Sequence, residues 1–164
     1  MSDTDDLELD TWHPRAMKRR SLMEHTPREF DVMPEAELSA FWYAPPMTHL
    51  RDLHRCHLLC GRIPGRIHFE ECQYVKGADY RSALQIAVRY LGLLPEDEPI
   101  RWSTSATALD PSLEEGSALA ELTLSFLSDP ITVRGDGTFG NGRHRVAAII
   151  DAQMDLLIPV VRMR

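Results

Sequence analysis

Residues 139–148 read FGNGRHRVAA, and this stretch decides the fold that we expect for the chain. Upstream of it, residues 131–133 are rich in β-branched side chains, which predicts a short strand. The Asp-Gly pair at residues 136–137 supplies the positive φ of a tight hairpin turn, so a returning strand is expected after it. Beyond Gly142, apolar side chains recur at helical spacing, which predicts a helix that begins at Arg143.

Three basic residues, Arg143, His144 and Arg145, fall in the first turn of that predicted helix. The free backbone N–H groups and the dipole at this end favour an anion, and each cation there costs about 0.3–1 kcal/mol. The pattern indicates either a charged helix start or a phosphate site. The candidate phosphate-binding residues are Gly140, Asn141, Gly142, Arg143, His144 and Arg145. The same reasoning predicts that Arg145→Ala leaves the apo fold intact.

Three segments of the C-terminal third resemble the ParB/sulfiredoxin superfamily. A predicted helix over residues 113–127 runs into Pro130-Ile131-Thr132-Val133, similar to the family's helix followed by P-I-x-V. Residues 136–148 are similar to its DG…(D/G)G-x-H-R-x-A-A box, and LLIPVV at residues 156–161 is similar to its closing strand. The resemblance covers roughly residues 100–164.

In that family the box binds nucleotide phosphates, ATP in sulfiredoxins and free-serine kinases and CTP in chromosome-partitioning ParB proteins. The resemblance implies phosphate contacts from Gly142, His144 and Arg145, and ATP or CTP with Mg²⁺ as ligand. Any reaction would be phosphoryl or nucleotidyl transfer or hydrolysis, with His144, Arg145 and Asp136 as candidate catalytic residues. Asp129 and Asp136 flank the candidate phosphate site and are either ligands of a metal ion bound with a triphosphate or a helix terminator and a turn residue.

Two departures from the family limit what the resemblance implies. Arg143 stands where sulfiredoxins carry the catalytic cysteine, so sulfiredoxin activity is not expected. No helix-turn-helix segment follows the closing strand in this sequence, which disfavours a ParB-type DNA clamp.

We therefore expect a nucleotide- or phosphate-ester-binding protein of prokaryotic or phage type, with or without catalysis. One alternative is a non-catalytic interaction or regulatory protein, such as a phage, plasmid or accessory factor, that keeps only the fold. Its partner contacts would come from Phe41, Trp42 and Tyr43 or from the N-terminal arm. A second alternative is a ParB-type DNA binder or nuclease.

The three cysteines and four of the seven histidines lie within residues 49–72. Two of the pairs are spaced by four, which on a helix places both side chains on one face, as a metal site needs. Buried free cysteines are common and the spacing is not C-x-x-C, so we favour a core role over zinc. If zinc binds, the expected ligands are Cys56, Cys60, His68 and Cys72.

The predicted fold class is α/β (α+β), with a helical N-terminal half packed on a small ParB/sulfiredoxin-like mixed-sheet unit. Residues 1–32 are polar and are expected to form a disordered or loosely packed arm. Residues 33–98 are expected to be helical, with a helix over 34–43 and another that Asp79 caps. Residues 99–164 would form the C-terminal domain.

The composition suits a cytoplasmic globular protein. Hydrophobic residues make up 43% of the 164 residues, enough for a core. The formal net charge of −7 disfavours non-specific binding of nucleic acid, which relies on Lys and Arg. No apolar run reaches the roughly 20 residues of a membrane helix, and the acidic N-terminus does not resemble a signal peptide.

Overall fold

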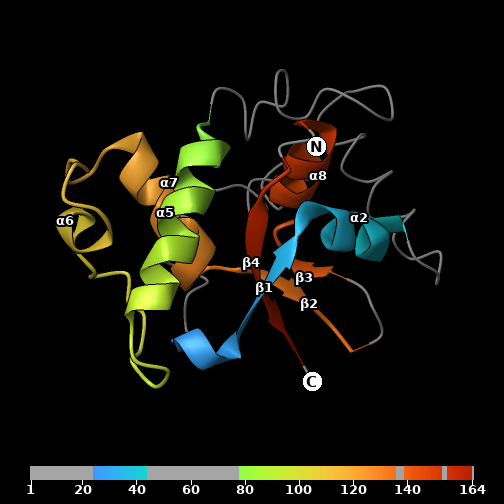
Figure 1. Cartoon of the computed structure of the whole chain (residues 1–164), viewed down its shortest axis with the longest axis horizontal. Coiled ribbons are helices and arrows are strands. Elements are labelled where there is room, and N and C mark those ends of the chain that lie inside the picture. The colour runs from blue at the N-terminus through green and yellow to red at the C-terminus, as the bar shows by residue number, and fades with distance from the viewer. Residues whose placement is uncertain (1–23, 44–77, 136–138, 153–154, 164) are drawn as a thin grey trace, which may run out of the picture.

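The computed structural model describes residues 24–43, 78–135, 139–152 and 155–163 (Figure 1). The elements in chain order are η2 (Pro27–Glu29), β1 (Phe30–Pro34), α2 (Glu35–Tyr43), α5 (Tyr80–Leu93), α6 (Ala106–Leu109), α7 (Ala118–Ser128), β2 (Ile131–Val133), β3 (Phe139–Asn141), α8 (Arg143–Ala152) and β4 (Leu157–Arg162). Helices and a sheet share the same core, so the general α/β class is confirmed.

The four strands form one mixed sheet in the order β1-β4-β2-β3. Strands β2 and β3 form an antiparallel hairpin, whereas β4 runs parallel to β2 and antiparallel to β1. A parallel partner for β2 requires a crossover, and α8 supplies it between β3 and β4. The sequence order of hairpin, helix and strand therefore places the start of α8 at the end of β3.

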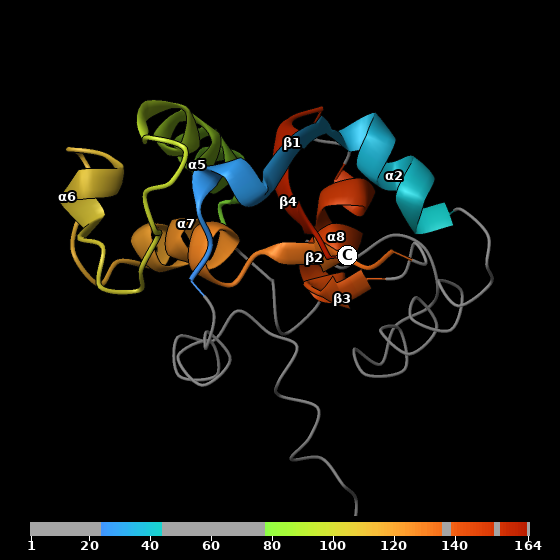
Figure 2. The ribbon, with the colours of Figure 1, turned by 90° about the horizontal axis from the view of Figure 1, so that it is seen from below.

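The sheet stands between two groups of helices (Figures 1 and 2). Helices α5, α6 and α7 lie on one side, and α2 and α8 lie on the other. Helix α5 packs on α7 through buried aromatic rings, with the Tyr80 and Phe126 centroids 5.7 Å apart in an edge-on arrangement. The apolar strand positions Ile131, Val133 and Val160 are buried within this core, as the pattern of β-branched residues requires.

Several elements that the sequence predicts are confirmed. Strand β2 covers residues 131–133, and α8 begins at Arg143. Helix α2 lies within the predicted range 34–43. The carboxylate of Asp79 accepts a hydrogen bond from the backbone N–H of Ser82 at 3.1 Å and caps α5 as expected.

The N-terminal half is not purely helical, because it supplies an edge strand. Residues 24–32 of the predicted arm are described, and Phe30, Asp31 and Val32 belong to β1. Residues of β1 pair with β4 in register, so that Met33 lies opposite Ile158 and is buried. One strand of the sheet thus comes from sequence far from the other three, and periodicity over so short a run did not reveal it.

The helix predicted over residues 113–127 begins later, at Ala118. Gly116 has a φ of 74°, which interrupts any helix, and the Ser117 side chain then caps α7 by accepting from the Ala120 N–H. Before this helix, the Asp110 carboxylate accepts hydrogen bonds from the N–H and hydroxyl of Ser112 in a local turn.

Candidate anion-binding site

The start of α8 is organised by Gly142. The Val146 N–H donates to the Gly142 carbonyl oxygen at 2.9 Å, so Gly142 occupies the N-cap position. Its φ of 86° is in the left-handed region, where glycine is far less strained than other residues. Through this glycine the chain turns from β3 directly into α8.

Helix α8 begins differently from α5, α6 and α7. Side chains of Asp79, Ser105 and Ser117 accept hydrogen bonds from the first turns of α5, α6 and α7. Gly142 has no side chain with which to do so, and the first turn of α8 carries no acidic residue. The N-terminal end of a helix is also the end at which an anion is favoured.

The Arg145 guanidinium lies against the C-terminal turn of α7. Its Nη1 donates to the Ser125 carbonyl oxygen at 3.0 Å, and its Nη2 donates to the Asp129 carbonyl oxygen at 2.7 Å. The guanidinium carbon is 5.3 Å from the centre of the Phe126 ring. Only 4% of the side chain is exposed. The Arg145 guanidinium therefore lies at the C-terminal end of α7, where the helix dipole favours a cation, and not at the N-terminal end of α8, where the dipole disfavours one.

The Asn141 side chain reaches the same segment. Its amide nitrogen donates to Asp129 Oδ1 at 2.9 Å and to the Pro130 carbonyl oxygen at 3.1 Å. The other carboxylate oxygen of Asp129 is 4.0 Å from the Arg145 guanidinium. The Asp129 carboxylate is thus engaged by two neighbours and only 12% exposed, which does not suit it to binding Mg²⁺ with a triphosphate.

The structure brings the candidate residues together at one turn but assigns them different surroundings. Gly140 and Asn141 lie in β3, and Gly142 precedes α8. Of Arg143 and His144, in the first turn of α8, the structure describes the backbone alone. Asp136 lies outside the described residues, as do the candidate zinc ligands Cys56, Cys60, His68 and Cys72. Among the described residues, no group of three or more His, Cys, Asp or Glu could hold a metal ion.

The aromatic triplet proposed for partner binding is described only in part. Phe41 is partly buried, and the Arg162 guanidinium carbon lies 5.0 Å from the centre of its ring. The side chains of Trp42 and Tyr43 lie outside the described residues.

Over the ranges that the structure covers, no helix has the length and apolar character needed to cross a membrane.

Sequence reasoning missed the partners of Arg145. Ser125 and Asp129 contribute mainly backbone carbonyl groups, which every residue type possesses, so no motif marks them.

No protein-family model, curated protein or solved structure matches the chain.

Proposed function

We propose that this chain binds a nucleotide or another phosphate ester, with the phosphate at the N-terminus of α8. The observation that carries the proposal is the first turn of that helix, which follows a glycine N-cap, contains Arg143, His144 and Arg145, and has no acidic residue. Arg143, and His144 when it is protonated, add positive charge at the end of the helix where the dipole disfavours it unless an anion is bound. A bound phosphate would turn that cost into a favourable interaction.

The backbone N–H groups of residues 143–145 hold the phosphate oxygens in this proposal, and Arg143 and His144 add charge. A ParB/sulfiredoxin-like character of the unit would make ATP or CTP the ligand. The support for that proposal is that the three similar segments supply the adjacent strands β4, β2 and β3 and the start of α8, and so form one part of the sheet. Phosphoryl or nucleotidyl chemistry at this turn would depend on positioning and charge stabilisation, with His144 as the first candidate residue.

A thermal-shift screen tests the proposal. The probes are ATP, CTP, GTP, cyclic nucleotides and inorganic pyrophosphate, each with and without Mg²⁺. A ligand at about 100 times its Kd stabilises a fold by roughly 2.7 kcal/mol. For a chain of this size, that corresponds to a rise in Tm on the order of 5–10 °C. If no phosphate-bearing probe raises the Tm, the proposal is wrong and the interaction-protein alternative gains weight.

Matched variants separate a local site from general charge attraction. Arg143→Ala and His144→Ala are expected to reduce the rise in Tm. Arg101→Ala removes the same charge from a side chain that is 60% exposed and paired with Glu24 on another part of the surface. It is expected to leave the rise unchanged, and an equal loss from Arg101→Ala would indicate non-specific attraction.

A further inference from the structure

Two polar side chains on either side of Gly142 hold one and the same segment of the chain. Asn141, before the glycine, donates to Asp129 and Pro130. Arg145, after it, donates to the carbonyl oxygen of Asp129. The segment that they hold is the junction between the end of α7 and the start of β2. The beginning of α8 is therefore tied to this junction at two points.

Gly142 shows how closely the junction and the helix start approach one another. A Cβ atom built on Gly142 would lie 2.8 Å from Cγ1 of Ile131 and 3.3 Å from its Cα. It would also lie 3.2 Å from Nη2 of Arg145. There is no room for a methyl group, so the backbone at the N-cap lies directly against β2.

The Arg145 guanidinium cannot serve a phosphate without leaving this arrangement. Both Nη atoms donate to carbonyl oxygens, and the residue as a whole is 3% exposed. Moving the guanidinium to a ligand would break those bonds and withdraw the cation from the C-terminal end of α7, where the helix dipole favours it.

We infer that Asn141 and Arg145 are positioning residues for the anion site, forming a junction clamp that fixes the first-turn N–H groups of α8 without touching the phosphate. This inference rests on the proposed function. It differs from the expectation that the motif resemblance implies for Arg145, which is direct contact with phosphate. Because the clamp acts through the backbone, its loss weakens ligand binding even in a variant that stays folded.

Titration calorimetry on the full chain tests the clamp, with ATP and inorganic pyrophosphate as probes. Asn141→Ala is expected to weaken binding about tenfold. This is the lower end of the loss in affinity seen when hydrogen bonds that support the ligands of metal sites are removed. Ser117→Ala is the matched control, because it removes a hydrogen bond at the opposite end of α7. Both variants should lower the urea midpoint, but Ser117→Ala should keep its affinity within about twofold. Arg145→Lys, which retains the charge, should bind better than Arg145→Met.

A spectroscopic readout separates positioning from direct contact. In wild-type protein titrated with pyrophosphate, the backbone amide signals of residues 143–145 should move, while the guanidinium signals of Arg145 stay in place. Guanidinium signals that move as far as the amides would overturn the inference. So would an Asn141→Ala variant that binds as tightly as wild type. Absence of binding to wild-type protein would instead overturn the proposed function, and the inference with it.

Discussion

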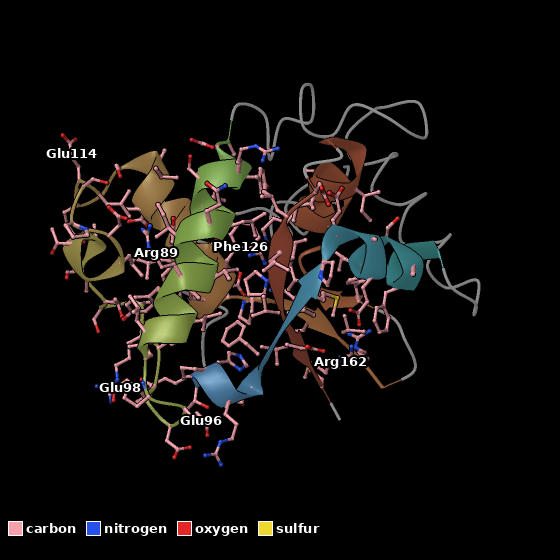
Figure 3. The ribbon with its side chains drawn as sticks, viewed as in Figure 1. Arg89, Glu96, Glu98, Glu114, Phe126 and Arg162 are labelled. Atoms are coloured by element: carbon pink, nitrogen blue, oxygen red, sulfur yellow. The ribbon has the colours of Figure 1, made fainter. Side chains whose placement is uncertain are left out.

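Two arginines of this chain make the same kinds of contact in very different surroundings. Arg145 stacks on Phe126 and lies near the Asp129 carboxylate, whereas Arg162 stacks on Phe41 and pairs with Asp31 and Glu37. Figure 3 shows Phe126 and Arg162 in separate parts of the molecule. The Arg145 side chain is 4% exposed and that of Arg162 is 49% exposed.

The difference in exposure decides what each arginine contributes. An ion pair on the surface replaces contacts that both charges already make with water, so it contributes little to the free energy of unfolding. Removing a buried guanidinium breaks its hydrogen bonds to carbonyl groups at a place where water cannot readily replace them. We therefore expect Arg145 to contribute strongly to the free energy of unfolding and Arg162 to contribute little, although their contacts look alike.

The largest expected effect comes from Arg145→Met. The Ser125 carbonyl oxygen keeps its hydrogen bond from the Asp129 N–H, but the Asp129 carbonyl oxygen loses the 2.7 Å hydrogen bond from Arg145. The methionine side chain also fills the space beside Phe126 less completely than the guanidinium does. The free energy of unfolding should fall by about 3 kcal/mol, measured by urea denaturation. A loss below about 1 kcal/mol would show that the buried Arg145 contributes no more to stability than the exposed Arg162, which would contradict the comparison.

The next largest effect tests how tightly α8 meets the junction. Gly142→Ala combines a left-handed φ with a close approach to Ile131, so a loss of about 2–3 kcal/mol is expected. Gly116 is the control, because its φ is 74° but nothing lies within 4 Å of a Cβ built there. Gly116→Ala should cost only about 1 kcal/mol. Equal losses of unfolding free energy in the two variants would mean that the close approach of Gly142 to Ile131 does not add to the cost of the substitution.

A much smaller effect is expected at the exposed arginine. Arg162→Met keeps an apolar stem over Phe41 and loses ion pairs of 2.7 Å to Asp31 and 3.2 Å to Glu37. The unfolding free energy should change by no more than about 1 kcal/mol, and less in 0.5 M salt because exposed pairs are screened. A loss as large as that of Arg145→Met would show that exposure does not separate the two.

The smallest effect is a pH dependence at the start of α2. Burial raises the pKa of the Glu35 carboxyl above its usual value of 4.5, with the Asp155 carboxylate adding to the rise, while the Asp155 N–H and Arg81 oppose it. Because the folded state holds this proton more tightly than the unfolded chain, its contribution to stability is lost as the pH rises through the folded-state pKa.

Glu35→Gln keeps an oxygen that can accept from the Asp155 N–H but has no proton to lose. Urea midpoints measured from pH 4 to pH 7 should show wild type losing stability relative to Glu35→Gln as the pH rises. Parallel profiles for the two proteins would contradict the direction assigned to Glu35.

The sequence was informative where a local pattern determines the structure. The strand at residues 131–133, the cap at Asp79 and the helix start at Arg143 each follow from a few adjacent residues. The pairing of β1 with β4 did not follow, since it joins residues more than a hundred positions apart in the sequence through backbone bonds. Long-range pairing leaves only a weak trace in any single segment.

The same limit explains Arg145. Its place in the first turn of α8 was predictable, and a cation there is unfavourable when only that helix is considered. The carbonyl groups that receive it belong to α7 and to the residue that follows it, and their presence depends on tertiary packing. In place of an intact fold after Arg145→Ala, we therefore expect a loss of stability at least as large as that predicted for Arg145→Met.

The central claim is that backbone N–H groups at the start of α8 hold a phosphate, and a pair of variants at Arg143 tests it most directly. Proline is tolerated at the first position of a helix but lacks the N–H, whereas alanine keeps it. Both variants remove the same charged side chain. With pyrophosphate or the nucleotide that gives the largest rise in Tm, Arg143→Pro should lose clearly more of that rise than Arg143→Ala, with apo Tm values close to one another. Equal rises in the two variants would contradict the account.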